Sequence, residues 1–95
     1  MTTMVVLAPA VERGLADLPR QVRRRLLAWM DVVVTEGIMR ARAVRGFRDE
    51  ALLGKLKGLR SIRLSRSYRA IYRVALGQGG RSCVYVEKVT KHVYR

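Results

Sequence analysis

The segment Arg60–Val74, "RSIRLSRSYRAIYRV", decides the fold of this chain. Apolar and polar residues alternate in two runs, Arg60–Leu64 and Tyr68–Leu76, with the three residues "SRS" between them. Such alternation is typical of β-strands with one buried face, and a connection of three residues fits a β-hairpin. The segment therefore predicts two antiparallel strands, although five of its fifteen residues are arginines.

The arginines of this hairpin gather on one face. On the second strand Arg69, Ile71 and Arg73 share a face, and on the first strand Arg63 points away from Ile62. A face that is merely solvated is expected to mix charges, because like charges opposed across strands are destabilising. Only one carboxylate follows residue 50. We therefore interpret the arginine face as a binding surface, rather than a solvated outer face.

The charge of the whole chain points to the same kind of partner. Twenty Lys and Arg against seven Asp and Glu give a net charge of +13. Residues 51–95 hold eleven of the basic side chains and a single acidic one. This asymmetry predicts a polyanionic partner: nucleic acid, an anionic membrane surface or an acidic protein. A membrane is disfavoured, because the uncharged run Met1–Val11 is too short to span one and lacks a preceding basic segment.

The 95 residues predict a single domain, 1–95. "TTMVVLA", residues 2–8, predicts a first strand, and Pro9 opens a helix in which Val11, Leu15 and Leu18 recur at helical spacing, with Pro19 ending it or starting the next. A second helix follows, with Asp17 as its expected cap, Val22, Leu26, Trp29 or Met30, and Val33 on its apolar face, and Gly37 as its stop. The triplet Arg23–Arg25 is expected on the solvated side of that helix.

Residues 38–58 are expected to be irregular, with at most one helical turn. After the hairpin, the turn "GQGG" leads into a last strand, Ser82–Tyr94, which contains Cys83 as a buried structural thiol. The predicted fold class is α+β, in the order β-α-α-β-β-β. It has one antiparallel sheet, into which the first strand is inserted, and a helix pair packed on one face. A single cysteine also predicts a reducing, cytoplasmic compartment.

The residue types narrow the possible chemistry. With one His, one Cys and the adjacent pair Asp49 and Glu50, the sequence has no metal-ligand pattern and no phosphate-binding glycine loop, so we expect no metal and no cofactor. Metal-free acid–base chemistry remains, and its candidate groups are Glu50, Tyr85, His92 and Tyr94. The expected phosphate-binding residues are Arg63, Arg66, Arg69 and Arg73, extended upstream by Lys55, Lys57 and Arg60.

Two segments resemble a known family. The segment from Glu50 to Val74 contains Leu-x-Gly-x-Leu-x-Gly and the "YRAIYRV" strand, and "VYVEKVTKH" ends at His92. Together they resemble the RelE/ParE toxin superfamily, especially its RelE and YoeB branch. The predicted strand–helix–helix–sheet order is also that of the family.

The resemblance implies a toxin that cleaves mRNA in the ribosomal A site without a metal and is held by an acidic antitoxin. Glu50 matches a proposed general base, and Arg69 with Arg63 matches the basic residues that stabilise the transition state. His92 and Tyr94 match the C-terminal catalytic positions, and the general acid stays open because Val93 separates two residues that are adjacent in YoeB-like members. The expected RNA-contacting residues are Lys55, Lys57, Arg60, Arg66, Arg73 and Lys91.

Two other functions remain open. ParE-like members of the superfamily inhibit DNA gyrase and need no catalytic residues. A basic RNA-binding module without catalysis would use the same arginine face. A carboxylate ahead of the glycine loop together with a C-terminal His and Tyr favours the nuclease.

Overall fold

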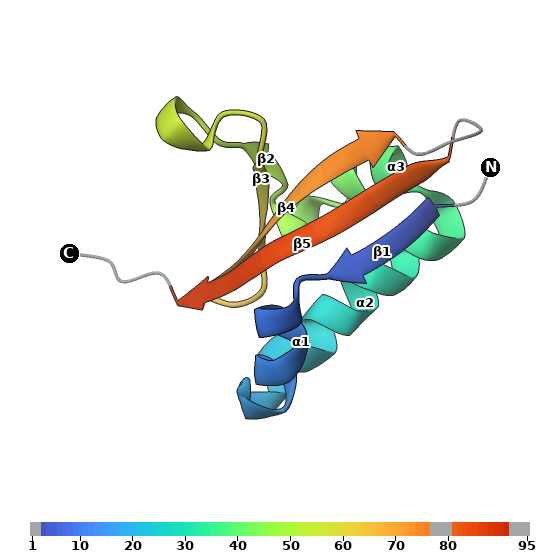
Figure 1. Ribbon diagram of the computed structural model, residues 1–95. Coiled ribbons are helices and arrows are strands. Elements are labelled where there is room, and N and C mark those ends of the chain that lie inside the picture. Colours follow the sequence, from blue (N-terminus) through green and yellow to red (C-terminus); the bar gives the residue numbers. More distant parts are fainter. Residues whose placement is uncertain (1–2, 77–80, 92–95) are drawn as a thin grey trace.

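The computed structural model describes residues 3–76 and 81–91, which form a five-stranded sheet with helices on one side (Figure 1). The strand order is β1-β5-β4-β3-β2. β1 runs parallel to β5, and the other neighbouring pairs are antiparallel. The strands span Thr3–Leu7 (β1), Glu50–Ala51 (β2), Arg60–Arg63 (β3), Tyr68–Leu76 (β4) and Ser82–Lys91 (β5).

The helices lie between β1 and β2 in the chain. α2 is the long one, and Figure 1 shows it behind the sheet, with β1, β5 and β4 in front. The helices are α1 (Pro9–Gly14), α2 (Arg20–Glu36) and α3 (Ile38–Arg42), and the short 3-10 turns are η1 (Leu15–Asp17), η2 (Arg45–Phe47) and η3 (Gly54–Leu56). No helix in the described part of the chain is long and apolar enough to cross a membrane.

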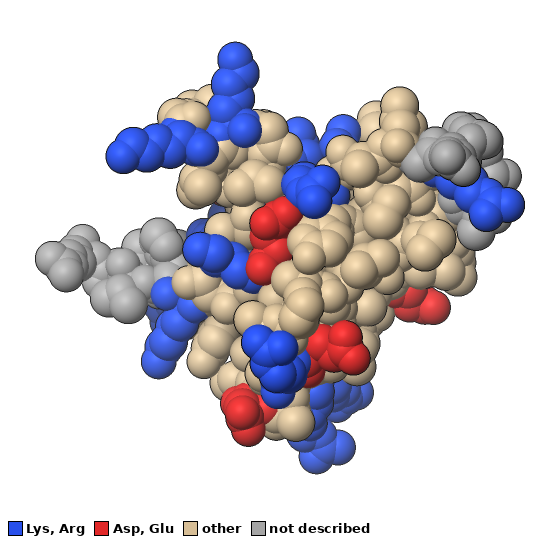
Figure 2. Space-filling model, in the orientation of Figure 1, with Lys and Arg blue, Asp and Glu red and all other residues tan. Residues whose placement is uncertain are grey.

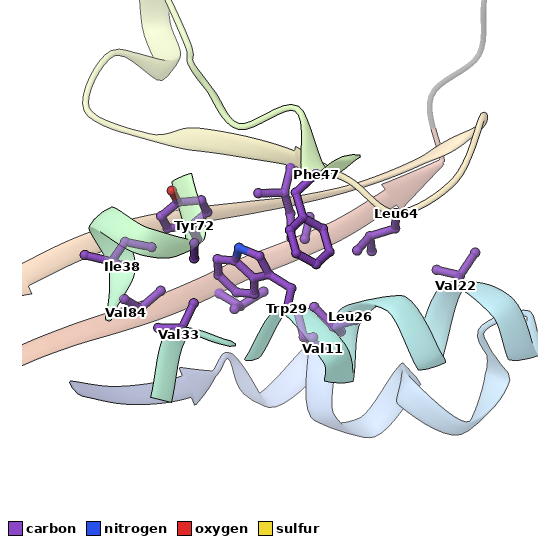
Figure 3. Close-up of a cluster of buried hydrophobic side chains, with 14 residues drawn as sticks. Val11, Val22, Leu26, Trp29, Val33, Ile38, Phe47, Leu64, Tyr72 and Val84 are labelled. Atoms are coloured by element: carbon purple, nitrogen blue, oxygen red, sulfur yellow. The ribbon is translucent and has the colours of Figure 1, made fainter. Parts of the chain in front are cut away.

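The core forms between α2 and the helix-facing side of the sheet. The predicted apolar face of α2 is confirmed, because Val22, Leu26, Trp29 and Val33 are buried. Trp29 packs on Tyr72 of β4 with ring centroids 5.0 Å apart (Figure 3). Aromatic rings at this separation add to the stability that burial already provides. The other face of the sheet carries no helix, so its side chains define the surface where a partner has access.

The predicted α+β class and the helix pair are confirmed, but the expectation of an all-antiparallel sheet with an inserted first strand is wrong. β1 lies at the edge of the sheet and runs parallel to β5. Alternation within a strand shows which residues share a face, but not the direction of its neighbour. The direction of β1 depends on the two helices that follow it, whose path is set by tertiary packing.

Local expectations at the helix ends and in residues 38–58 were partly wrong. Asp17 does not cap α2: Pro19 takes that position without a side-chain cap. Gly37 does end the helix, in a positive-φ conformation that suits glycine. Residues 38–58 contain more than the single helical turn expected, because α3, η2 and η3 all lie there, together with the unpredicted strand β2. Strands of two residues carry no alternation that sequence reasoning could detect.

Arg25 is not on a solvated face as expected. Its Nη2 donates to the carbonyl of Gly46 at 2.6 Å, and its Nε donates to the carbonyl of Arg63 at 3.3 Å. The guanidinium also lies 4.7 Å from the centre of the Phe47 ring. One side chain of α2 thus connects the helix to η2 and β3.

The prediction for Cys83 is also wrong, because this residue of β5 is half-buried rather than buried.

Candidate active site

The helix-free face of the sheet brings a carboxylate, a hydroxyl and an apolar side chain into one row. Glu50 of β2 lies opposite Ser61 of β3, and Ser61 lies opposite Ile71 of β4. Side chains at directly opposed positions point to the same face. Glu50 is exposed and Ser61 is buried, so the small serine is recessed between the larger side chains of Glu50 and Ile71.

A second row lies next to the first and carries positive charge. Arg63 of β3 is paired with Arg69 of β4, and Arg69 is paired with Thr90 of β5. Both arginines are half-buried, and the Nε of Arg63 donates to the carbonyl of Ser65 at 3.4 Å. Two guanidinium groups therefore leave the same face of the sheet side by side. Their row crosses β3 at Arg63, two residues further along the strand than Ser61, which lies opposite Glu50.

The two rows border one cavity of about 410 Å³, which the loop before β3 completes. Its polar residues come from four strands, and its apolar residues come from β4 and from the loop that contains η3. The lining residues are Glu50, Leu52, Leu56, Ser61, Arg69, Ile71 and Thr90. We call this cavity the Glu50 groove. It gathers two of the five predicted catalytic residues, Glu50 and Arg69, with Arg63 next to Arg69.

Exposed basic side chains lie in the loop before β3, in the turn after it and on β4. Lys55 and Lys57 are exposed in the loop of η3, and basic side chains project from this loop at the upper left of Figure 2. Arg66 is exposed in the turn between β3 and β4. Arg73 is exposed on β4 and donates to the carboxylate of Glu87, with Nε and Oε1 2.6 Å apart.

Arg73 also restricts a candidate proton-transfer group. Its guanidinium lies 4.8 Å from the centre of the Tyr85 ring. A stacked guanidinium over the ring leaves less of that tyrosine for contact with a partner. The sequence did not predict this pairing, because Arg73 and Tyr85 come from different strands.

Two of the predicted RNA-contacting residues lie elsewhere. Arg60 is paired with Tyr72 on the helix-facing side of the sheet, where its Nε lies 2.6 Å from Oδ1 of Asp49. Lys91 is paired with Tyr68, which packs against the core, and it lines a separate cavity next to Pro19. Neither side chain borders the Glu50 groove.

Asp49 is the residue near the groove whose role the sequence did not reveal. Its side chain is fully buried, and it accepts hydrogen bonds from Arg60 and from the hydroxyl of Tyr72. Burial and the hydrogen bond to Asp49 raise the pKa of Tyr72 to about 12, against the opposing effect of Arg42. Burial, the largest single effect, lowers the pKa of Arg60, but the hydrogen bond to Asp49, the charge of Asp49 and the proximity of Tyr72 together raise it overall. The Tyr72 hydroxyl is therefore a donor throughout the neutral pH range.

Two predicted residues, His92 and Tyr94, lie outside the described residues, so the groove is described without them. Within residues 3–76 and 81–91, no three His, Cys, Asp or Glu side chains are arranged to hold a metal ion. The described groove thus offers a carboxylate as a proton acceptor and guanidinium groups as stabilisers of an anion.

Solved structures share this architecture over nearly the whole chain. A YoeB/ParE toxin from Agrobacterium tumefaciens superposes with a TM-score of 0.70 at 17% identity, over 95% of this chain and 99% of its own. RelE in the archaeal RelE–RelB complex from Pyrococcus horikoshii OT3 gives a TM-score of 0.68 at 24% identity, with both chains fully covered. This chain has the RelE-like fold. No protein-family model matches the sequence, and comparison with curated proteins gives no match.

The architecture is shared with proteins whose sequences differ widely from this one. The YoeB–YefM complex from Staphylococcus aureus also matches, with a TM-score of 0.65 at 15% identity over 99% of this chain and 100% of the other. At such identities the core is maintained by pattern and volume rather than by particular residues. The fold implied by the resemblance of residues 50–94 is confirmed.

Proposed function

We propose that this chain is the toxin of a toxin–antitoxin pair and that it cleaves mRNA on the ribosome, in the cytoplasm. The observation that carries the proposal is the Glu50 groove, where a carboxylate and an arginine line one cavity on the helix-free face. An acidic and a basic group in one cavity match the needs of RNA cleavage by an internal hydroxyl. The likeness of the fold to RelE and YoeB toxins supports the same conclusion.

The proposed reaction uses the ribose 2′-hydroxyl of the mRNA as the nucleophile. Glu50 accepts the proton of this hydroxyl, whose oxygen then attacks the adjacent phosphorus. Arg69 and Arg63 stabilise the negative charge that develops on the phosphoryl oxygens. The bond to the 5′-oxygen of the next nucleotide breaks, that oxygen takes a proton, and a 2′,3′-cyclic phosphate remains. His92 is the proposed proton donor, with Tyr94 as the second candidate, because an ordinary histidine titrates near neutrality.

Binding of the mRNA needs no base-specific contact in this scheme. Lys55, Lys57 and Arg66 place exposed positive charge before and after β3, and Arg73, whose guanidinium is paired with Glu87, lies on β4. Contacts of Lys and Arg with phosphates supply affinity that does not depend on sequence. Arg60 and Lys91, which face the other side of the sheet, are left out of this proposed surface.

An acidic antitoxin is the proposed partner when the toxin is idle. The net charge of +13 on 95 residues favours a negatively charged protein that covers the arginine face. Two of the similar structures are named as toxin–antitoxin complexes, RelBE2 from Mycobacterium tuberculosis and YoeB–YefM from S. aureus. Expression of this chain alone should arrest growth, and co-expression of its acidic partner should restore it. Harmless accumulation of folded protein would contradict the toxin role.

Primer extension on a translated mRNA tests the cleavage itself. The purified chain is added to a translation reaction, with ribosome-free mRNA as the parallel sample. Ribosome-dependent cuts are expected, and Glu50→Gln should lower their rate about 100- to 10,000-fold. Arg24→Ala, which removes an exposed charge on α2 far from the sheet face, is the matched control and should cut normally.

Inhibition of DNA gyrase is the second candidate, because one structural neighbour is named a YoeB/ParE toxin. Supercoiling by gyrase in the presence of the chain separates the two functions. Growth arrest with intact mRNA and blocked supercoiling would replace the nuclease proposal by gyrase inhibition. Undiminished toxicity of Glu50→Gln without inhibition of gyrase would indicate a basic RNA-binding module.

A further inference from the structure

We infer that Asp49 is a positioning residue for the Glu50 carboxylate. Its buried side chain holds β2 against the sheet, so that the next residue stays over the Glu50 groove. The inference rests on the proposed role of Glu50 and extends it to residues on the opposite side of the sheet. Asp49 itself does not line the groove.

The strand that carries Glu50 has little to stabilise it. β2 consists of two residues, both exposed, and its one neighbour in the sheet order is β3. Two strand pairs, Glu50 with Ser61 and Ala51 with Arg60, define its register. Edge strands this short fray easily, because few buried contacts oppose their opening. A catalytic base needs a fixed position, so the required rigidity has to come from outside β2.

Asp49 provides this attachment from the core side. Its carboxylate is fully buried and binds two strands at once, through Oδ1 to Nε of Arg60 at 2.6 Å and through Oδ2 to the hydroxyl of Tyr72. Arg60 belongs to β3 and Tyr72 to β4. A buried carboxylate is tolerated only when it is paired and hydrogen-bonded, so movement of Asp49 out of this position is costly. The segment is therefore fastened at the residue directly before Glu50.

The backbone before Asp49 is fixed as well. Phe47 is buried, and Arg25 covers its ring and binds the carbonyl of Gly46. Arg48 then adopts a left-handed conformation with φ of 47°, which non-glycine residues seldom adopt without support from the surrounding structure. After this turn Asp49 points into the core and Glu50 points to the opposite face. Neighbouring residues of an extended chain alternate in this way.

A double-mutant cycle distinguishes positioning from general support of the fold. Tyr72→Phe keeps the ring in the core but removes the hydroxyl that binds Asp49, and Asp49→Asn removes the charge. Each is combined with Glu50→Gln, and single-turnover cleavage is measured on programmed ribosomes at saturating toxin, per folded molecule. Val84→Ala, a cavity variant in the core of β5, is the control for lost stability.

If Asp49 acts through Glu50, Tyr72→Phe should slow cleavage about 10- to 100-fold in the wild-type background, since misplacement of a catalytic group by about 1 Å has effects of this size. In the Glu50→Gln background the same change should have no further effect, because residues that act as a unit are not additive. Val84→Ala should leave the rate per folded molecule unchanged in both backgrounds. Normal cleavage by Tyr72→Phe, or a full additive loss with Glu50→Gln, would overturn the inference.

Hydrogen exchange gives a readout that needs no enzymatic activity. The amide of Leu52, which follows β2, donates to the carbonyl of Leu59 at 3.0 Å. In Tyr72→Phe and Asp49→Asn this amide should exchange at least about tenfold faster, while amides in the centre of β5 keep their protection. Unchanged exchange at Leu52 would overturn the inference. If the wild type does not cleave mRNA but Leu52 responds as expected, the proposed function fails and the attachment of β2 by Asp49 stands.

Discussion

Arg63 and Arg69 are direct partners across β3 and β4, so two guanidinium groups leave the same face of the sheet from opposed positions. Like charges opposed in this way destabilise a sheet. A fold selected for stability alone would place a carboxylate or a neutral side chain at one of the two positions. In the proposed reaction the two guanidinium groups bind two oxygens of one phosphoryl group, since planar Arg donors match phosphate oxygens.

Replacement of Arg69 tests whether this pair stabilises the transition state. Arg69→Ala should lower the rate of mRNA cleavage about 100- to 1,000-fold, the usual effect of removing one contact to a developing anion. The fold should persist, because Arg69 lies on the helix-free face and its loss removes no side chain from the core. Primer extension measures the cuts and circular dichroism the fold. Near wild-type cleavage would mean that the anionic transition state is bound elsewhere.

Because the pKa of Tyr72 is raised, we expect the free energy of unfolding to fall at alkaline pH. The pKa of this hydroxyl is raised to about 12 in the folded chain, against about 10 in an unfolded one. A raised pKa favours folding as long as the group is protonated in both states. The contribution, about 1–3 kcal/mol, is therefore complete below pH about 10 and disappears as the pH approaches 12.

Urea unfolding between pH 8 and pH 11, compared for the wild type and Tyr72→Phe, measures this contribution. The free energy of unfolding of the wild type should fall more steeply above pH about 10 than that of the variant. Lysines titrate in the same range in both proteins, so the difference between the two curves isolates Tyr72. Parallel curves would show that its hydroxyl is not bound to Asp49 in solution.

Arg25 and Gly46 should be coupled in stability. A Cβ at position 46 would lie 3.0 Å from Nη2 of Arg25, which binds the carbonyl of the same residue. Gly46→Ala should therefore weaken the contact and lower the free energy of unfolding by about 1 kcal/mol. In an Arg25→Met background, the same change should have little effect. Equal losses in both backgrounds would place the cost of Gly46→Ala in the backbone rather than in the contact with Arg25.

The general acid is tested at the two C-terminal candidates, for which the prediction rests on the sequence. His92→Gln keeps a hydrogen-bonding group but removes the titrating one, and it should slow cleavage about 100- to 10,000-fold. Tyr94→Phe should slow it less, because an ordinary tyrosine with a pKa near 10 stays protonated at pH 7. Full pH–rate profiles of both variants decide the assignment. A limb near pH 6–7 that survives in His92→Gln would transfer the titrating role to another group, with Glu50 the next to examine.

Sequence reasoning succeeded where one short-range pattern determines the outcome. The spacing of Val22, Leu26 and Val33 predicts the buried face of α2, and the alternation around Ile62 and Ala70 predicts which side of the hairpin is buried. The position of Arg63 next to Arg69 follows from the same hairpin. Each of these relationships joins residues that are close in the chain.

The failures concern contacts between distant residues. Alternation places Arg60 on the side of Ile62, opposite to Arg63, but it does not reveal the partner of Arg60, which is Asp49, eleven residues away. Arg25 appears solvated within "RRR", yet its hydrogen-bond partners are 21 and 38 residues away. No local pattern distinguishes a paired arginine from an exposed one. The groove itself depends on β2, whose two residues give no signal before the sheet is assembled.

The parallel pairing of β1 with β5 has a consequence for folding during synthesis. Thr3 is the strand partner of Ser82, and Leu7 is the partner of Val86. The first strand to leave the ribosome therefore cannot pair until the last strand has been made. At about 5–20 residues per second, several seconds of synthesis separate the two strands. Until β5 arrives, β4 has no neighbour on that side and Arg69 has no Thr90 beside it. The nascent chain therefore passes through a stage in which the Glu50 groove is incomplete, and the proposed cleavage activity is not expected before β5 has been made.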